Sequence, residues 1–461
     1  MVQFLPDELA AWTGGSWSRR PAAPPTGFAI DTRQLRAGQA FVALKTGRRD
    51  GHDFLPAAAA AGASAALVAA ASPGNRLPQL VVADPAAAFQ DVARRHRRRF
   101  ERPVIGISGS AGKTSTKELL ALVLGEGVLA TEGNLNNQLG VPLTLTRLDP
   151  AVHLHAVIEA GIGAPGEMGP LAAMIAPDIA IITLVAAAHL AELGDLAGVA
   201  REKALLAAAV RAGGAAIFPA SCAGWPAFRE LGGRTVVVGR AGELAALPPA
   251  RPEEERIAFA TSHRGDETTI TVGGESPPAA YSLRRVSEGM AQNAVLAVCA
   301  ARRLGLPAAS IRRRLAAWRP APLRGELRRD GDRLLYLDCY NANPAAMADA
   351  VAAFVAAAPA DRPRLYVLGG MEELGPDSAR YHRELGRGLH LRPNDFLCVL
   401  GPEAGSIREG ALENGNRPEQ IEVVASLAPV AARLAAFAGA VFVKGSRKYA
   451  LETLVGEAAH A

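Results

Sequence analysis

The chain has 461 residues, a formal net charge of +5 and four cysteines. This length exceeds what one hydrophobic core usually organises, so we expect three domains. The arginines are scattered apart from short runs at 94–99 and 312–314 that lack adjacent aromatic platforms, which disfavours a nucleic-acid partner. Widely spaced cysteines favour reduced, buried thiols, and no apolar stretch reaches the roughly twenty residues that span a bilayer, so we expect a cytoplasmic protein without membrane insertion.

Residues 1–100 form the first predicted domain. Helices are predicted at 7–12, 54–61 and 86–99, and strands at 40–44 and 65–68. The proline-rich stretch 21–25 is a predicted loop. This pattern indicates a small α/β domain.

Residues 101–320 form the second predicted domain. Apolar runs predict strands at 104–108, 155–159, 179–185 and 215–219, separated by helical stretches. Such alternation predicts a parallel sheet covered on both faces. The stretch 244–283 differs, because it holds β-branched, turn-rich runs and no clear helix. We expect it to form an antiparallel appendage.

The first of these strands leads into a glycine-spaced turn and then a helix, the pattern of a phosphate-binding loop (P-loop). Its glycines allow the close backbone approach by which successive N–H groups surround phosphate oxygens, and the helix N-terminus adds partial positive charge. In this pattern Lys113 reaches the β- and γ-phosphates, and the Thr114 hydroxyl can ligate Mg²⁺. The alternative is a glycine-rich turn without a ligand. The predicted ATP loop comprises Gly109, Ser110, Ala111, Gly112, Lys113, Thr114 and Ser115.

Two polar residues follow other strands of the same predicted sheet. Glu159 closes the strand 155–159, and His189 follows the strand 179–185. Ligands of open parallel sheets gather beyond the carboxyl ends of the strands, so Glu159 is a natural Mg²⁺ ligand there. A surface carboxylate is the alternative for Glu159, and a packed loop residue is the alternative for His189. Lys203 lies on a predicted helix, where a solvated lysine is the ordinary interpretation.

Residues 321–461 form the third predicted domain. Strands are predicted at 334–337, 365–368, 396–400, 422–424 and 441–443, separated by helical stretches. This series predicts a Rossmann-like domain. The predicted fold class is therefore α/β in three domains: a small N-terminal domain, a central P-loop ATPase domain on a parallel sheet, and a Rossmann-like C-terminal domain.

The glycine loop and the run Thr-Glu-Gly-Asn-Leu-Asn-Asn-Gln-Leu-Gly-Val-Pro at 131–142 strongly resemble the Mur ligases, the ATP-dependent amide-forming enzymes of peptidoglycan synthesis. The run Tyr-Asn-Ala-Asn-Pro at 340–344 is similar to the signature of the members that add D-alanyl-D-alanine. The likeness spans the whole chain, with further matches at 31–33, 41–44, 50–52, 323–326, 369–375 and 443–447. It implies that the N-terminal domain holds a UDP-sugar substrate, the central domain ATP, and the C-terminal domain the incoming amine.

The resemblance also implies roles for individual residues. Catalysis is assigned to Lys113, Lys203 and His189, with Lys203 at the position of a carbamylated lysine. The Mg²⁺ ligands are Thr114, Glu159, His189 and Lys203. Beyond the P-loop, ATP contacts fall to Asn293, Arg324 and Asp338. Substrate contacts fall to Thr32, Arg33, Asn137, Tyr340, Asn341 and Asn343.

The implied cofactors are ATP and Mg²⁺, and the implied substrates are UDP-N-acetylmuramoyl-tripeptide and D-alanyl-D-alanine, joined by a monomeric enzyme through an acyl phosphate. Alternatives are another Mur-type or folylpolyglutamate-type ligase, or a nucleotide-binding P-loop protein without ligase activity. The chain departs from the family pattern at seven positions: Ala111, Leu184, Ala186, Gly289, Leu337, Cys339 and Gly370.

Overall fold

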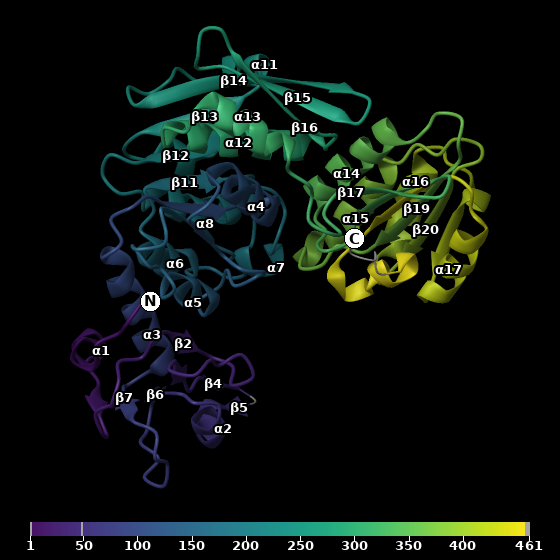
Figure 1. Ribbon diagram of the computed structural model, residues 1–461. Coiled ribbons are helices and arrows are strands. Elements are labelled where there is room, and N and C mark those ends of the chain that lie inside the picture. Colours follow the sequence, from purple (N-terminus) through teal and green to yellow (C-terminus); the bar gives the residue numbers. More distant parts are fainter. Residues whose placement is uncertain (1, 48, 457–461) are drawn as a thin grey trace.

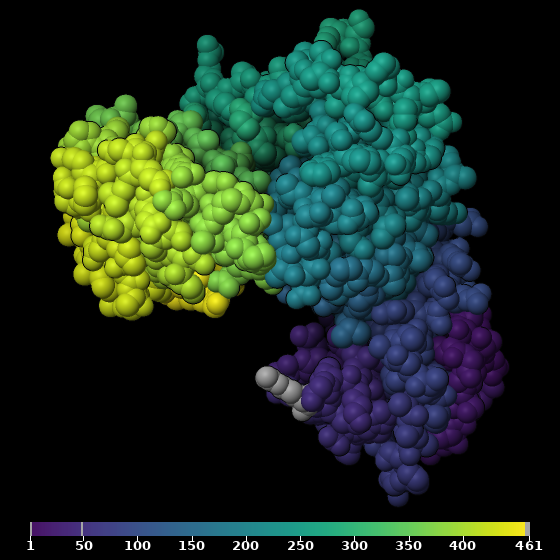
Figure 2. All heavy atoms as spheres, turned by 180° about the vertical axis from the view of Figure 1, so that it is seen from behind, coloured from purple at the N-terminus to yellow at the C-terminus, as the bar shows by residue number. Residues whose placement is uncertain are grey.

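The computed structural model describes residues 2–47 and 49–456. Three large sheets follow one another along the chain, with five, nine and six strands, and a two-stranded ribbon of β4 (Lys45–Thr46) and β5 (Arg49–Asp50) accompanies the first (Figure 1). The middle part of the chain contacts both end parts, and a hollow separates the N-terminal part from the C-terminal part (Figure 2). The predicted α/β fold class is confirmed.

The N-terminal sheet has the order β1-β7-β6-β3-β2, parallel except for β1. Its strands are β1 (Ser16–Trp17), β2 (Phe28–Ala29), β3 (Ala40–Val42), β6 (Ala65–Val68) and β7 (Gln79–Val81). Its helices are α1 (Pro6–Thr13), α2 (Leu55–Ala60) and α3 (Pro85–Arg98). Asp84 starts α3 by accepting the Ala86 amide, with Pro85 at the first helical position. The strands that we did not predict, β1, β2 and β7, have only two or three residues and are too short to show a period.

The central sheet has the order β16-β15-β14-β13-β12-β11-β8-β10-β9. Its parallel strands are β8 (Val104–Ser108), β9 (Val128–Ala130), β10 (His155–Glu159), β11 (Ile179–Ile182), β12 (Ala215–Pro219) and β13 (Thr235–Gly239). Its helices are α4 (Lys113–Leu124), α5 (Gly140–Leu145), α6 (Met168–Ile175), α7 (Leu190–Leu193), α8 (Leu196–Ala208), α9 (Ala220–Ala223), α10 (Pro226–Arg229), α11 (Ala241–Ala245), α12 (Glu288–Arg303) and α13 (Ala308–Ala316). Strand β8 lies between β10 and β11, so the P-loop leaves the middle of the parallel part.

Two predictions for the central domain need correction. The stretch 244–283 does contain antiparallel strands, β14 (Glu254–Arg264), β15 (Glu267–Val272) and β16 (Ala279–Arg284), but β14 pairs in parallel with β13 and extends the central sheet rather than forming an appendage. It also overlaps the short helix α11. The strand predicted at 179–185 ends at Ile182, because the backbone beyond it turns to bond the P-loop.

The C-terminal sheet has the order β17-β18-β22-β19-β20-β21, parallel except for β17. Its strands are β17 (Glu326–Asp330), β18 (Arg333–Asp338), β19 (Arg364–Gly369), β20 (Phe396–Leu400), β21 (Ile421–Val424) and β22 (Ala440–Lys444). Its helices are α14 (Pro344–Ala357), α15 (Ser378–Arg387), α16 (Ala404–Glu413) and α17 (Leu427–Ala436). The edge strand β17 was missed because its sequence, Glu-Leu-Arg-Arg-Asp, is too polar to read as a strand.

All four cysteines are free and buried, which confirms the expected thiols. Among the described helices, none combines the length and the apolarity that a bilayer crossing requires.

Candidate active site

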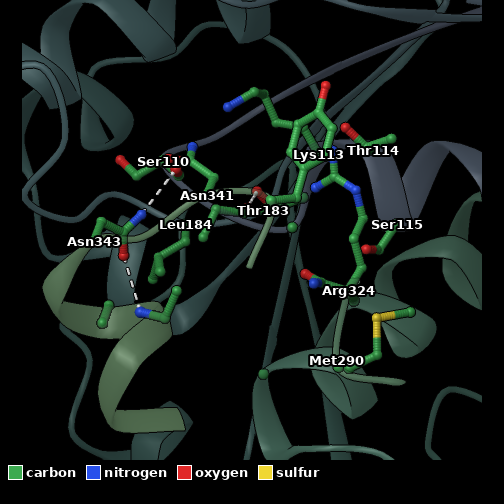
Figure 3. A pocket seen from close by; sticks show the side chains of 18 of the residues that line it. Ser110, Lys113, Thr114, Ser115, Thr183, Leu184, Met290, Arg324, Asn341 and Asn343 are labelled. Carbon is green, nitrogen blue, oxygen red and sulfur yellow. Dashed lines mark hydrogen bonds between the residues drawn. The ribbon is translucent and has the colours of Figure 1, made fainter. Parts of the chain in front are cut away.

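A cavity of about 600 Å³ lies where the carboxyl ends of β8, β10 and β11 face the C-terminal domain. Most of the predicted site residues line it: Ser110, Ala111, Gly112, Lys113, Thr114, Ser115, Asn137, Glu159, His189, Asn293, Arg324, Asp338, Tyr340, Asn341 and Asn343. Figure 3 shows P-loop residues close to Arg324, Asn341 and Asn343 from the other domain. Gly109, Lys203, Thr32 and Arg33 are outside this lining.

Two P-loop positions tolerate only glycine. Gly109 has φ +150°, and a Cβ there would lie 1.8 Å from the Thr183 Oγ1. Gly112 has φ +78°, and a Cβ there would lie 2.3 Å from the Asn293 Nδ2. The loop therefore packs directly against the segment after β11 and against α12, as a backbone cradle for phosphate requires.

Lys113 begins α4 at the mouth of this loop. Its Nζ donates to the Gly109 carbonyl oxygen at 2.7 Å. Burial lowers the pKa of Lys113, and the charge of Glu159 opposes that shift. An anionic phosphate in the loop would compensate the buried ammonium better than a carbonyl oxygen does, because the bond would then join opposite charges.

The P-loop is fastened to the segment after β11 through backbone groups. The Ser110 amide donates to the Leu184 carbonyl at 2.8 Å. The Ser110 hydroxyl donates to the Ala186 carbonyl at 2.9 Å and accepts the Ala186 amide at 3.0 Å. None of these bonds uses the side chain of Leu184 or Ala186, so the departures from the family pattern at these two positions leave the fastening intact.

Glu159 presents an unused oxygen at the end of β10. Its Oε1 accepts the Thr114 hydroxyl at 3.2 Å and the Asn136 amide at 2.8 Å. Its Oε2 is buried without a hydrogen-bond partner among the described residues. A carboxylate and a hydroxyl beside a phosphate loop are the donors that Mg²⁺ prefers. Glu159 and Thr114 therefore present oxygen atoms that would fit a Mg²⁺ ion.

His189 lies in the same cavity but faces the C-terminal domain. Its backbone is left-handed, with φ +55°, and its Nδ1 lies against the carboxylate of Glu373, which is also left-handed with φ +63°. Burial lowers the pKa of His189, and the charge of Glu373 opposes this. Across the two described stretches of the chain, no three His, Cys, Asp or Glu side chains gather to hold a metal by themselves.

Lys203 lies on α8 and is only 2% exposed. Burial holds the pKa of Lys203 well below its usual value, and the charge of Lys113 lowers it further. Burying an amine in this way is costly. A lowered pKa gives the neutral amine that reacts with CO₂.

The C-terminal domain contributes a second group of side chains. Asp338 and Lys444 end the adjacent strands β18 and β22 in register, and the Lys444 Nζ lies 2.6 Å from the Asp338 Oδ2. The Arg324 guanidinium lies 3.9 Å from the centroid of the Tyr340 ring. This cation–π contact holds one positive charge at the cavity edge.

Asn343 joins the two domains at the P-loop. Its Oδ1 accepts the Ala346 amide at 2.9 Å and so caps α14, while its Nδ2 donates to the Ser110 carbonyl at 3.2 Å (Figure 3). One side chain thus starts α14 and attaches it to the nucleotide loop.

Thr32 and Arg33 follow β2 in the N-terminal domain. The Arg33 guanidinium is exposed and lies 2.6 Å from the Asp31 carboxylate, and its hydrogen bonds lower the pKa of Asp31 to about 2. The structure does not bring these residues into the cavity lining.

Several residues of this site were not predicted from the sequence. Asn136 binds Glu159, Thr183 binds the Ala111 carbonyl, and Lys444 binds Asp338. Asn136 and Lys444 lie inside runs that matched the Mur ligases, which was an available signal. Asp349, in contrast, is an ordinary residue of a predicted helix and reaches the cavity only through the docking of the C-terminal domain.

The chain is similar to known proteins in sequence and in fold. Three family descriptions match the chain: "Mur ligase family, catalytic domain" at residues 25–97, "Mur ligase middle domain" at 107–301, and "Mur ligase, glutamate ligase domain" at 323–447. The UDP-N-acetylmuramoyl-tripeptide--D-alanyl-D-alanine ligase of Escherichia coli (strain K12) is 32% identical over 435 residues, 92% of each chain. The chain belongs to the Mur ligase family. It is an ATP-dependent ligase of peptidoglycan precursor synthesis, and the resemblance seen in its sequence is confirmed.

Solved structures of other Mur ligases show the same architecture. MurF from Acinetobacter baumannii has a TM-score of 0.85 and 27% identity, and the match covers 98% of both chains. MurF from Thermotoga maritima, solved in complex with ADP, has a TM-score of 0.79 and 25% identity over 93% of this chain and 96% of that one. The likeness therefore spans all three domains of this Mur ligase.

Proposed function

We propose that this Mur ligase joins D-alanyl-D-alanine to UDP-N-acetylmuramoyl-tripeptide and converts ATP to ADP and phosphate. The relatives described above carry that activity in their names. The observation that carries the proposal is that the P-loop and three residues of the Tyr-Asn-Ala-Asn-Pro segment, Tyr340, Asn341 and Asn343, line one cavity. Another Mur-type or folylpolyglutamate-type ligase would need the same loop but not this segment.

The proposed division of labour follows the three domains. Residues 1–100 would bind the UDP moiety, with Thr32 and Arg33 at that site, and residues 101–320 would bind ATP. Residues 321–461 would bring the dipeptide amine, with Asn137, Tyr340 and Asn341 at the peptide substrates and Arg324 and Asp338 at ATP. The exposed Arg33 guanidinium suits a diphosphate, because it is a rigid, permanently charged fork.

The reaction would proceed in two displacements. A carboxylate oxygen of the tripeptide attacks the γ-phosphorus of ATP, the bond from that phosphorus to the bridging β,γ-oxygen breaks, and ADP leaves. The dipeptide amine then attacks the acyl phosphate carbon, loses a proton, and expels phosphate as the amide forms. Lys113 and the loop amides stabilise charge on the transferring group, and closure of the C-terminal domain aligns the amine and excludes water. No enzyme nucleophile is required.

Thr114, Glu159 and His189 would hold Mg²⁺, and a carbamate on Lys203 would complete that environment. When bound, Mg²⁺ neutralises phosphate charge as a Lewis acid. For Thr114 and Glu159 the fit rests on the unpartnered Oε2 of Glu159. For Lys203 it rests on a buried amine of lowered pKa, the form that takes up CO₂.

We place this chemistry in the cytoplasm and in a monomer. Four free, buried cysteines suit a reducing compartment. The cavity is lined by residues of this one chain from two of its domains.

The proposal predicts that ADP release requires both peptide substrates, the UDP-tripeptide and D-alanyl-D-alanine. Purified enzyme with ATP and Mg²⁺ should release ADP and form UDP-N-acetylmuramoyl-pentapeptide only when UDP-N-acetylmuramoyl-tripeptide and D-alanyl-D-alanine are both present, measured by coupled ADP assay and by mass spectrometry of the product. A parallel panel of UDP-dipeptide with free amino acids, and of folate with glutamate, serves as control. Turnover on either control, or steady ADP release without an acceptor, would assign the chain to one of the alternatives.

A further inference from the structure

A carboxylate of the C-terminal domain reaches the start of a helix in the central domain. Asp349 lies on α14, and its Oδ1 accepts the backbone amide of Gly289, the second residue of α12, at 3.0 Å. The first amides of a helix lack partners within the helix. Ser287 caps α12 within its own domain by accepting the Met290 amide at 3.2 Å. Asp349 therefore supplies a second cap from across the domain boundary.

Gly289 makes this approach possible. A Cβ at position 289 would lie 2.7 Å from the Asp349 Oδ2, which is closer than real Cβ atoms come, and 3.1 Å from its Cγ, so the carboxylate would have to shift. Gly289 does not have a left-handed backbone. Its lack of a side chain therefore leaves the space that the Asp349 carboxylate occupies, and the backbone conformation does not demand a glycine here.

The helix α14 contacts the central domain at a second point as well. Six residues before Asp349, the cap residue Asn343 donates to the Ser110 carbonyl in the P-loop at 3.2 Å. The helix α12 that Asp349 caps also carries Asn293, which lies against Gly112 on the other side of the loop. Through these two contacts α14 bridges the P-loop and α12, the two walls of the nucleotide cavity.

We propose that Asp349 is a positioning residue that docks the C-terminal domain on the nucleotide-binding helix α12 by capping it across the domain boundary, and that Gly289 is its obligatory partner. The helix macrodipole favours a carboxylate at this end. Burial raises the pKa of the Asp349 carboxyl, while hydrogen bonds from Ser287 and the Gly289 amide lower it. The contact thereby couples the domain that brings the amine to the one that binds ATP.

The test compares variants by solution scattering and by steady-state kinetics. Asp349→Ala removes the cap, Asp349→Asn keeps one acceptor oxygen, and Gly289→Ala inserts the obstructing methyl group. The matched control is Asp332→Ala, which removes an exposed carboxylate from the turn between β17 and β18 of the same domain.

Loss of a helix cap corresponds to about a tenfold change in a docking equilibrium. We expect Asp349→Ala and Gly289→Ala each to increase the radius of gyration of the ligand-free enzyme. Each should also raise KM for the dipeptide about tenfold, with kcat changed less than about twofold. Asp349→Asn should have a radius of gyration and a KM for the dipeptide close to those of the unmodified enzyme, because it keeps one acceptor oxygen. Because an alanine at 349 leaves room for the methyl group, the double variant should be no worse than Asp349→Ala alone.

Scattering and KM values for Asp349→Ala equal to those of Asp332→Ala would overturn the proposal. So would a Gly289→Ala effect of the same size with and without Asp349, because it would show that the two residues do not act through each other. If Asp349→Ala fails to fold, the comparison of Asp349→Asn with Gly289→Ala decides alone. The kinetic arm rests on the proposed function, whereas the scattering arm does not, so failure of amide synthesis in the unmodified enzyme would leave the docking inference to be judged by scattering.

Discussion

Replacing Lys113 with alanine is expected to lower ATP-dependent amide synthesis at least about a thousandfold, because the variant loses the cation nearest the transferring phosphoryl group. The Lys113 ammonium is desolvated, and its Nζ donates a hydrogen bond of 2.7 Å to the Gly109 carbonyl oxygen of the loop. Its charge is therefore already positioned before ATP binds. The measurement is ADP release with UDP-tripeptide and D-alanyl-D-alanine both at saturating concentrations.

The matched control is Lys448→Ala, which removes an exposed lysine whose Nζ lies 3.0 Å from Glu372. We expect it to retain activity within about twofold, as for surface ion pairs. Equal activity of Lys113→Ala and Lys448→Ala would remove the P-loop from the mechanism.

Replacing Lys203 with methionine is expected to separate activity from stability. In magnesium-free, CO₂-depleted buffer we expect the free energy of unfolding of the variant to be about 1–3 kcal/mol higher than that of the unmodified enzyme, because burial disfavours the Lys203 ammonium and methionine places an apolar chain of similar shape there. Its amide synthesis should fall at least about a hundredfold, since the proposed carbamate ligand of Mg²⁺ could no longer form at this position. Denaturant unfolding and ADP release measure the two effects.

Lys117 provides the comparison for this experiment. It is as buried as Lys203, but its Nζ donates to the Thr131 carbonyl at 2.8 Å. Lys117→Met should therefore destabilise the protein, because it leaves that carbonyl unpaired. A destabilised Lys203→Met with full activity would show that Lys203 is a structural residue.

The sequence predicted most of what local patterns determine. The strands β8, β10, β12 and β20 have the predicted bounds because each is a short apolar run between turn residues. The P-loop was predicted with its lysine and hydroxyl because their spacing is set by one turn and the start of one helix. The placement of Glu159 beside Thr114 followed from the rule that parallel strands end at one edge.

Contacts that depend on how the domains dock could not be predicted. The contact of His189 with Glu373 joins residues far apart in the sequence, and so does the cap that Asp349 places on α12. Neither residue of either pair carries a local signal for its partner. Gly289 was recognisable only as a departure from the family pattern, and its physical reason required the position of Asp349.

Lys203 lies between these two groups, because its burial was not predicted by its local pattern but was indicated by the composition of the chain. The chain has only six lysines among its 50 basic residues, so arginine is its ordinary surface cation. Three of those lysines, Lys117, Lys203 and Lys444, are buried. In such a composition a lysine on a predicted helix is itself informative, and Lys203 is buried rather than solvated.

Transfer of oxygen from the tripeptide to phosphate tests the acyl phosphate most directly. With UDP-tripeptide labelled by ¹⁸O in its terminal carboxylate, the attacking oxygen should remain on phosphorus when the amine displaces phosphate. We therefore predict that each phosphate released with the amide carries one carboxylate-derived oxygen, detected by mass spectrometry. Unlabelled phosphate accompanying full amide synthesis would contradict a mechanism in which ATP activates the peptide acid.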